Sequence, residues 1–255
     1  MNKKEFIQNY FKVKIMNLDH WRDGIEGGLD KTVVHIPARS GSTRIKDKNI
    51  QSVSGLPLLA YSVLLAKCLK GVDRVIINTD SRLYADIAQE YGAEVLFIRP
   101  KELAGSTANT FWAYYYALRF FIDQGYPVKT IITLSPTSPF RNLARTQDMV
   151  DSLRCCGMLQ TCFRVNVNLR DVVSESPLTK RIPFARDEET VQKSTLVKFL
   201  GNFNGQHVVQ SDITARELVF IDDPIELIDI DTKEDLRLME FVIDNRLYDF
   251  GVSLC

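Results

Sequence analysis

From residue 32 onward, short runs of β-branched residues alternate with amphipathic stretches of helical spacing, and this alternation limits the possible folds more than any other feature. Such alternation is typical of a largely parallel sheet with helices packed on both faces. The expected strands cover residues 32–36, 74–78, 93–98 and 130–134, and the expected helices cover residues 57–65, 83–91, 110–122 and 146–153. In open α/β sheets, ligands bind beyond the carboxyl ends of the strands. The sequence therefore predicts an α/β fold with its site at that edge.

The C-terminal part returns to strands after a stretch with few clear periods. Residues 206–210, 218–221 and 225–230 have strand character, and a helix is expected over residues 233–244. Residues 164–205 mix basic and acidic side chains, and we expect acceptor contacts, a dimer element or both there. Residues 1–30 end in a glycine-rich hinge, so we predict an N-terminal appendage followed by a single domain of residues 31–255.

Composition excludes several classes of protein. The formal net charge of zero argues against a nucleic-acid partner, because duplex binding requires a concentrated positive surface. The five cysteines are odd in number and lack C-x-x-C spacing, so neither a disulfide framework nor a zinc site is indicated. No apolar stretch is long enough to span a membrane, and residues 1–30 are too charged for a signal-peptide core. We therefore expect a cytoplasmic protein that binds no membrane.

The loop at residues 37–49 follows the first expected strand and is rich in small and basic residues. Gly41, Ser40 and Ser42 would let backbone N–H groups approach an anion, and the basic residues of the loop supply charged donors. The loop contains neither the P-loop nor the dinucleotide-binding pattern. From the residues alone, a phosphate cradle and a solvated basic turn are equally good interpretations.

The motif Pro37-Ala38-Arg39-x-Gly41-Ser42-x-Arg44-x-x-x-Lys48-Asn49 resembles the N-terminal signature of the acylneuraminate cytidylyltransferases. Four later segments resemble the same family in the same order. They are residues 75–80, residues 99–104 with Thr107 and Ala108, Pro136-Thr137-Ser138-Pro139-Phe140-Arg141, and residues 228–232 with Glu234-Asp235-Leu236. The likeness covers about residues 32–153 and 225–240.

The resemblance implies a three-layer, Rossmann-like nucleotidyltransferase (GT-A-like) fold with a mostly parallel central sheet. It also implies a magnesium-dependent enzyme that joins CMP from CTP to an acidic nine-carbon keto sugar and releases pyrophosphate, and it implies a homodimer. On the matched motif, Arg39 and Lys48 would be the catalytic cations on the triphosphate, with Arg44 assisting. Other expected substrate contacts are Ala38, Ser42, Asn49, Asp80, Arg99, Ala108, Thr110 and Ser135.

Asp229 and Asp231 are the expected Mg²⁺ ligands. Residues two apart at a strand end point to the same face, and there a cation between the two carboxylates would offset their repulsion. The alternative is a pair of solvated acids before a helix capped by Asp231 or Thr232. Asp80 is also open to two interpretations, because it could orient the ribose, a sugar hydroxyl or Lys48, or it could cap the helix that begins near Ser81.

Two residues expected near the acceptor sugar differ from those that the family usually has. Thr43 stands where the family usually has lysine, and Ser135 replaces a glutamine that meets the sugar. The family's basic residues that meet the sugar carboxylate do not align with residues 164–205, so the candidates there are a pool of four: Arg170, Lys180, Arg181 and Arg186. His35 is expected to be a core residue, and no histidine is assigned as a general base. Another nucleotide, another acidic sugar and a non-catalytic nucleotide-binding subunit remain as alternatives.

Overall fold

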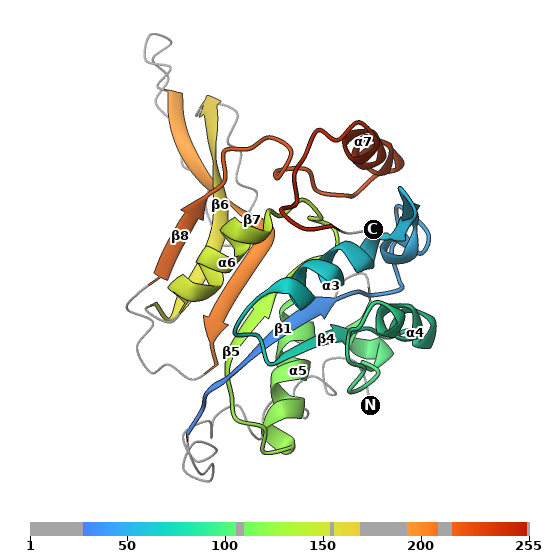
Figure 1. Cartoon of the computed structure of the whole chain (residues 1–255), viewed down its shortest axis with the longest axis vertical. Coiled ribbons are helices and arrows are strands. Elements are labelled where there is room, and N and C mark those ends of the chain that lie inside the picture. The colour runs from blue at the N-terminus through green and yellow to red at the C-terminus, as the bar shows by residue number, and fades with distance from the viewer. Residues whose placement is uncertain (1–27, 106–109, 154–155, 169–192, 209–215, 254–255) are drawn as a thin grey trace, which may run out of the picture.

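A six-stranded sheet forms the centre of the molecule, as the alternating pattern predicts (Figure 1). The computed structural model describes residues 28–105, 110–153, 156–168, 193–208 and 216–253. The strands lie in the order β4-β1-β5-β7-β6-β8. Their bounds are β1 Lys31–Pro37, β4 Arg74–Asn78, β5 Val128–Thr133, β6 Met158–Asn168, β7 Lys193–His207 and β8 Arg216–Phe220.

Most neighbouring strands run parallel. β1 pairs in parallel with β4 and β5, and β6 pairs in parallel with β8. β7 is antiparallel to both of its neighbours, β5 and β6. The predicted mostly parallel sheet is therefore confirmed. Because β1 is an inner strand covered on both faces, its residues 33–36 are all buried, which explains why three of these four residues are apolar and β-branched.

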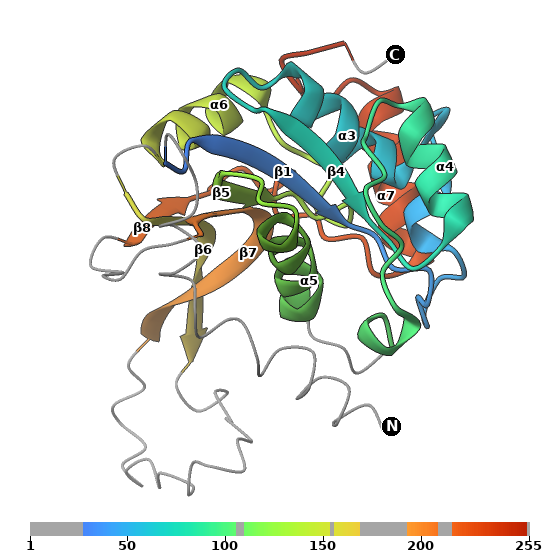
Figure 2. The same ribbon diagram turned by 90° about the horizontal axis from the view of Figure 1, so that it is seen from below.

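Helices cover both faces of the sheet and produce three layers (Figure 2). Helices α3 (Leu58–Cys68), α4 (Arg82–Glu90) and α6 (Leu143–Ser152) pack against Val34 and Ile36 of β1 on one face. Helix α5 (Thr110–Asp123) packs against Val33 on the opposite face. Successive residues of β1 thus belong to different cores, as the alternation of side chains along a strand requires.

A third apolar cluster joins the C-terminal helix α7 (Lys233–Asp244) to the short strands β2 (Ser52–Val53) and β3 (Leu56–Pro57). The predicted bounds of α7 are confirmed. Thr232 and Asp235 form a capping box at its start, which supports the Thr232 alternative of the two predicted caps. Two short 3-10 helices, η2 (Lys48–Ile50) and η3 (Lys101–Leu103), lie beside the carboxyl ends of the strands.

Two predicted strands are wrong. Residues 93–98 form only an isolated bridge between Ile76 and Glu94 before the chain leaves the sheet edge. Residues 225–230 form a turn in which Ile228 N donates to Ile225 O. Their isoleucines pack into the third cluster, so tertiary packing overrides strand propensity here.

The sheet also extends further than the sequence predicts. The strand predicted at 206–210 is the end of β7, which starts at Lys193, and β6 was not predicted. β7 lies largely, and β6 partly, within residues 164–205, the stretch with few clear periods. Most of the predicted appendage, Ala108, Arg170, Lys180, Arg181 and Arg186 lie outside the described residues, and the domain division stays a prediction. Among the described helices, none is both long and apolar enough to cross a membrane.

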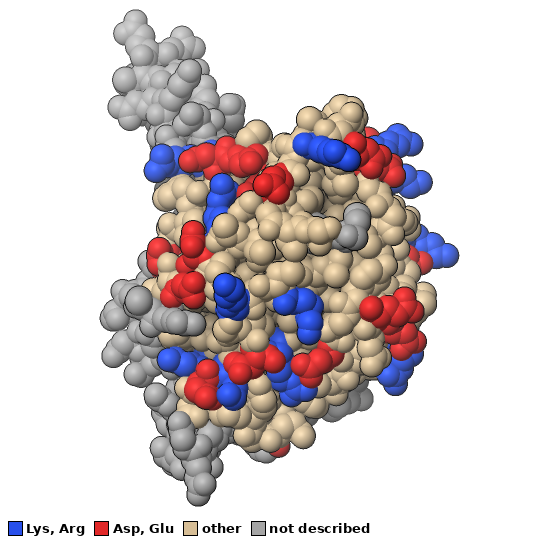
Figure 3. Space-filling view, in the orientation of Figure 1, with Lys and Arg blue, Asp and Glu red and all other residues tan. Residues whose placement is uncertain are grey.

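The face shown in Figure 3 carries basic and acidic side chains interspersed over its described part. No broad patch of one sign is visible on that face. This distribution agrees with the formal net charge of zero and differs from the concentrated positive surface of a nucleic-acid-binding protein.

Candidate active site

A cavity of about 410 Å³ lies at the carboxyl ends of β1 and β5, at the edge that the strand order predicts. It brings together Arg39, Ser42, Arg44, Lys48, Asn49, Arg99, Ser135 and Asp231 from the predicted site. Pro37, Thr43, Leu103, Ala113 and Thr137 complete its wall. Segments that are far apart in the sequence therefore converge on one cavity, and the cradle interpretation of loop 37–49 is the better supported of the two.

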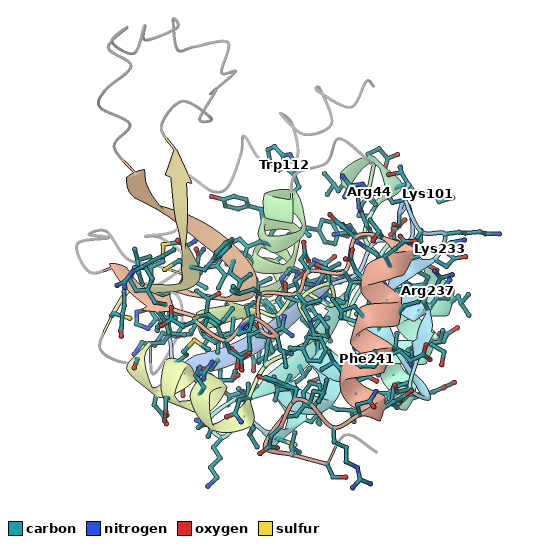
Figure 4. The ribbon with its side chains drawn as sticks, turned by 90° about the horizontal axis from the view of Figure 1, so that it is seen from above. Arg44, Lys101, Trp112, Lys233, Arg237 and Phe241 are labelled. Carbon is teal, nitrogen blue, oxygen red and sulfur yellow. The ribbon has the colours of Figure 1, made fainter. Side chains whose placement is uncertain are left out.

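Lys48 connects loop 37–49 to the acidic segment, by which we mean residues 228–232 with Asp229 and Asp231. Its buried ammonium group donates to Ile230 O at 2.5 Å and to Asp231 Oδ1 at 2.9 Å. Arg44 Nη1 donates to Asp231 Oδ2 at 2.5 Å, although the Arg44 side chain is 66% exposed. The Lys48 hydrogen bond, followed by the charges of Lys48 and Arg44, lowers the pKa of Asp231. Figure 4 shows Arg44 near Lys233, at the N-terminal end of α7.

Asp229 has the opposite electrostatic character. Desolvation by surrounding protein atoms raises its pKa, and the charge of Asp231 raises it further, while a hydrogen bond from Thr137 opposes the rise. The two carboxylates thus interact electrostatically, although the strand that was predicted to align them is absent. The argument from strand alternation was wrong, because residues 228–231 form no strand.

These carboxylates suit a hard divalent cation. Mg²⁺ is usually held by one or two carboxylates together with phosphate and water oxygens. Lys48 and Arg44 lower the pKa of Asp231 and so keep this carboxylate ionised, as a metal ligand must be. Within the described residues, no group of three or more acidic, histidine or cysteine side chains could hold a metal. Asp229 and Asp231 are thus the residues that would hold Mg²⁺, with substrate oxygens needed to complete its coordination.

Asp80 fastens the start of the loop. Its carboxylate accepts hydrogen bonds from Ser40 N at 2.9 Å and from Ser40 Oγ at 2.8 Å. Ser81, and not Asp80, caps α4 by accepting from Tyr84 N. The capping interpretation of Asp80 is wrong, and so is the idea that it orients Lys48, whose ammonium contacts Asp231 instead.

Arg99 places a buried guanidinium in the cavity wall. It is 4% exposed, and its Nη2 lies 3.9 Å from Asp80 Oδ1. Desolvation lowers its pKa to about 10, partly offset by Asp80. Its Nε has no hydrogen-bond partner among the described residues. A buried donor without a partner is costly, so Arg99 is well suited to meet a ligand acceptor.

Arg39 and Asn49 are both held by backbone oxygens. Arg39 Nη1 donates to Gly105 O at 2.9 Å, and Asn49 Nδ2 donates to Arg39 O at 3.0 Å. Asn49 Oδ1 is buried without a partner in the described part of the chain. Ala38 is fully buried, and its N–H is committed to Asn78 O, so that amide donor is already used. Thr110 begins α5.

The sequence analysis missed the role of Arg141. This buried guanidinium donates from Nε to Asn202 O, from Nη1 to Ser62 Oγ at 3.1 Å and from Nη2 to Ser135 O at 2.6 Å. Desolvation lowers its pKa to about 9. Arg141 thereby ties the cavity wall at Ser135 to β7. The motif that ends in Arg141 was recognised, but no role was attached to the arginine.

His35 is a core residue, as predicted. It is fully buried, and its ring nitrogens lie 3.3 Å from Thr133 Oγ1 and 2.9 Å from Asn78 Nδ2. Desolvation, followed by the charge of Arg99, lowers its pKa to about 3. The ring is therefore neutral at physiological pH.

The family model described as cytidylyltransferase matches residues 33–244. The N-acylneuraminate cytidylyltransferase of Escherichia coli O18:K1:H7 is 29% identical over 82% of this chain, and the match spans about half (51%) of that relative. The CMP-N,N'-diacetyllegionaminic acid synthase of Legionella pneumophila is 28% identical, with 82% of this chain and 94% of the relative covered.

A solved structure shares the fold. The CMP:2-keto-3-deoxy-manno-octonic acid synthetase complexed with CTP superposes with a TM-score of 0.59 at 18% identity. The match covers 85% of this chain and 99% of that one. At this identity the likeness concerns the fold alone, and it confirms the predicted nucleotidyltransferase-type arrangement.

Proposed function

The chain belongs to the cytidylyltransferase family, and on that premise we propose that it transfers CMP from CTP to an acidic nine-carbon keto sugar, with release of pyrophosphate. The observation that carries this proposal is the hydrogen bond from Lys48 to Asp231, which joins the basic loop to the acidic segment. The relatives named for acylneuraminate and diacetyllegionaminic acid support the acidic-sugar acceptor.

The loop cations would bind the triphosphate. Lys48 lies deepest and is fixed by two acceptors, so it would hold a phosphate oxygen with little loss of conformational freedom. Arg39 lines the same cavity and would stabilise the charge that develops on departing pyrophosphate. Arg44 is exposed, and it would exchange its bond with Asp231 for a bond with phosphate when CTP enters.

Asp229 and Asp231 would hold Mg²⁺. The cation would polarise the α-phosphate and offset the negative charge of the reacting groups. Desolvation and the charge of Asp231 raise the pKa of Asp229, so a bound cation would offset the cost of keeping both carboxylates ionised. His35 is buried and has too low a pKa to accept the proton of the attacking anomeric hydroxyl. Arg99 would contact the nucleotide through its unpartnered Nε.

Ser135 and Thr137 would help to position the acceptor. Their hydroxyl groups lie 3.0 Å apart in the cavity wall, and Arg141 fixes the backbone of Ser135. A serine reaches less far than the glutamine that the family usually has here. The replacement favours an acceptor whose nearest polar group differs from that of the usual family substrates, so a different acidic sugar is the second candidate.

The proposal is tested by identifying the product formed from CTP, Mg²⁺ and a panel of neuraminic, legionaminic, pseudaminic and octulosonic acids. We expect a CMP–sugar of matching mass from CTP with a nine-carbon acid, and much less product with ATP, GTP or UTP. Product from the eight-carbon octulosonic acid alone, or from another nucleotide, would contradict the proposal. CTP binding without product from any acid would favour a non-catalytic subunit.

The metal assignment has its own test. Asp229→Asn and Asp231→Asn should each abolish turnover and weaken Mg²⁺ binding measured by calorimetry with a non-reactive CTP analogue. Full activity in either variant would overturn the assignment. We also propose a homodimer, which sedimentation equilibrium of the full chain tests by its mass.

A further inference from the structure

Asp47 has an unusual backbone conformation directly before Lys48 and Asn49. Its φ of 52° and ψ of 38° lie in the left-handed helical region. Residues with a Cβ seldom adopt this region, because the Cβ approaches a backbone oxygen, although aspartate and asparagine tolerate it better than other types do. In the part of the chain that the structure describes, the other non-glycine residues with positive φ are Ser54 and Arg246. Within loop 37–49, which is fully described, Asp47 alone is strained in this way.

This conformation determines where the next two side chains lie. Asp47 precedes the short helix η2, and Ile50 N donates to Asp47 O at 3.0 Å. Lys48 and Asn49 are both buried on η2, and both line the cavity. Lys48 Nζ thereby reaches Asp231 Oδ1 at 2.9 Å. A different φ at Asp47 would turn η2 and carry the Lys48 ammonium group away from its acceptors.

Tyr84 of α4 holds the Asp47 side chain. Its hydroxyl donates to Asp47 Oδ1 at 3.2 Å, and the tyrosine is only 1% exposed. Desolvation, followed by the charge of Asp47, raises the pKa of Tyr84, so the phenol stays protonated and remains a donor. The Asp47 side chain makes no capping hydrogen bond to η2. Its conformation is therefore supported by a partner 37 positions away, and not by a local hydrogen bond of the kind that an aspartate can make.

The same part of the chain fixes both ends of loop 37–49. Asp80, which precedes α4, accepts hydrogen bonds from Ser40 N and Ser40 Oγ near the start of the loop. Tyr84, in the first turn of α4, donates to Asp47 near the end of the loop. In the ribbon, α4 lies beside the segment that follows β1 (Figure 1). The backbone that carries the loop cations is therefore held at two points by contacts within the chain itself.

We propose that Asp47 is a positioning residue for the transfer reaction, because its left-handed backbone, held by Tyr84, directs the Lys48 ammonium group into the cavity. This inference rests on the proposed function, since it gives Asp47 a role through that of Lys48. A cation that is fixed in advance loses little conformational freedom when the triphosphate binds. The alignment set by Asp47 should therefore appear in kcat, although Asp47 itself does not line the cavity.

Substitutions at Asp47 separate the backbone conformation from the hydrogen bond. Asp47→Asn keeps the tolerance of the left-handed region and an acceptor oxygen, Asp47→Gly keeps the conformation alone, and Asp47→Val keeps neither. At saturating CTP we expect native kcat in Asp47→Asn, a loss of about tenfold or less in Asp47→Gly and a loss of about 100-fold in Asp47→Val. Tyr84→Phe, which keeps the ring and loses the hydroxyl, should behave as Asp47→Gly does.

A double substitution tests whether Asp47 acts through Lys48. In the Lys48→Met background, Asp47→Val should lower kcat by no more than about twofold further, because the group that it positions is already absent. A role of Asp47 in general stability would instead give two independent losses that multiply.

Ser54→Val and Tyr91→Phe are the matched controls. Ser54 has a φ of 47°, but it lies in the turn between β2 and β3. Tyr91 follows α4 and packs against the same apolar cluster as Tyr84. Both variants should keep native kcat, since neither residue contacts loop 37–49 through a hydrogen bond that the proposal uses.

NMR of the Lys48 ammonium group tests the inference without any sugar. Two acceptors hold this group in the native protein, so its hydrogens should exchange slowly with water. Slow exchange should be kept in Asp47→Asn and lost in Asp47→Val, or in Asp47→Ala if the valine variant does not fold. A native protein that forms no CMP–sugar would contradict the proposed function, and this measurement would still decide the role of Asp47.

Three results would each overturn the inference. They are native kcat in Asp47→Val, a loss in Asp47→Val that multiplies fully with that of Lys48→Met, and slow exchange of the Lys48 ammonium hydrogens in every Asp47 variant.

Discussion

Lys48 Nζ lies 2.9 Å from Asp231 Oδ1, a contact that joins residues 183 positions apart in the chain. The lysine comes from the loop after β1, and the aspartate precedes α7. The same ammonium group also bonds Ile230 O. This contact joins the proposed phosphate-binding residues to the proposed metal-binding residues, so substitution of Lys48 tests both together.

Replacing Lys48 with methionine should lower turnover by about 100-fold or more, because a preorganised cation on the transferring phosphate is lost. The loss should appear mainly in kcat, measured as pyrophosphate release at saturating CTP. Lys67→Met is the control, since Lys67 is an exposed residue at the end of α3 and should leave turnover unchanged. Equal activity in the two variants would remove Lys48 from the mechanism.

Asp80→Ala should raise KM for CTP by about tenfold, because the loop loses two hydrogen bonds to a charged acceptor at Ser40. Asp80→Asn should recover part of the loss, since it keeps one acceptor oxygen. Initial rates over a range of CTP concentrations measure the effect. Asp86→Ala, on the exposed side of α4, should behave as the native protein does. An unchanged KM in Asp80→Ala would show that Ser40 does not need this anchor.

Acid stability should report on His35. Its pKa is about 3 in the folded state, below the ordinary value of 6.5, because the ring is desolvated. Below about pH 6 the unfolded chain therefore takes up a proton that the folded chain cannot, and the free energy of unfolding falls by on the order of 1 kcal/mol for each pH unit. This loss continues until the pH approaches the folded pKa.

His35→Gln has no titrating group at this position, so its free energy of unfolding should fall less steeply with acidification than that of the native protein. Urea unfolding over a series of pH values measures both slopes. Parallel slopes would contradict the buried, neutral assignment of His35, whatever the absolute stability of the variant.

Gly205→Ala should destabilise the fold by about 1–3 kcal/mol through overpacking. An added Cβ would overlap Leu153 Cδ1 and would lie 2.9 Å from Phe203 Cε1, both in the buried layer beneath α6. Gly201→Ala is a milder comparison, because its Cβ would meet only Ser138 Oγ at 3.4 Å. Thermal unfolding measures both, and equal melting temperatures would contradict the packing at β7.

The parallel half of the fold was predictable because its signals are local. β1 has apolar β-branched residues on both of its faces, and α7 carries its own capping box, so these local patterns locate both elements. The cavity was predictable because the loop cations and Asp231 follow strands or precede a helix at one edge. Neither inference required knowledge of distant contacts.

The remaining features depend on contacts that no local pattern encodes. Asp229 and Asp231 were expected on a strand, but the isoleucines between and before them pack against α7 instead. Asp80 looked like a cap, yet its partner is Ser40, 40 positions earlier. β6 and β7 pair with each other over an irregular register, which is a long-range feature that period analysis does not detect.

The most direct test of the account is the stoichiometry of pyrophosphate release from CTP and Mg²⁺ as N,N'-diacetyllegionaminic acid or N-acetylneuraminic acid is added. We expect pyrophosphate release to depend on the sugar, with one pyrophosphate formed for each CMP–sugar. In Lys48→Met this release should be lost. Release that is independent of any sugar, or no release with any acidic keto sugar, would contradict it.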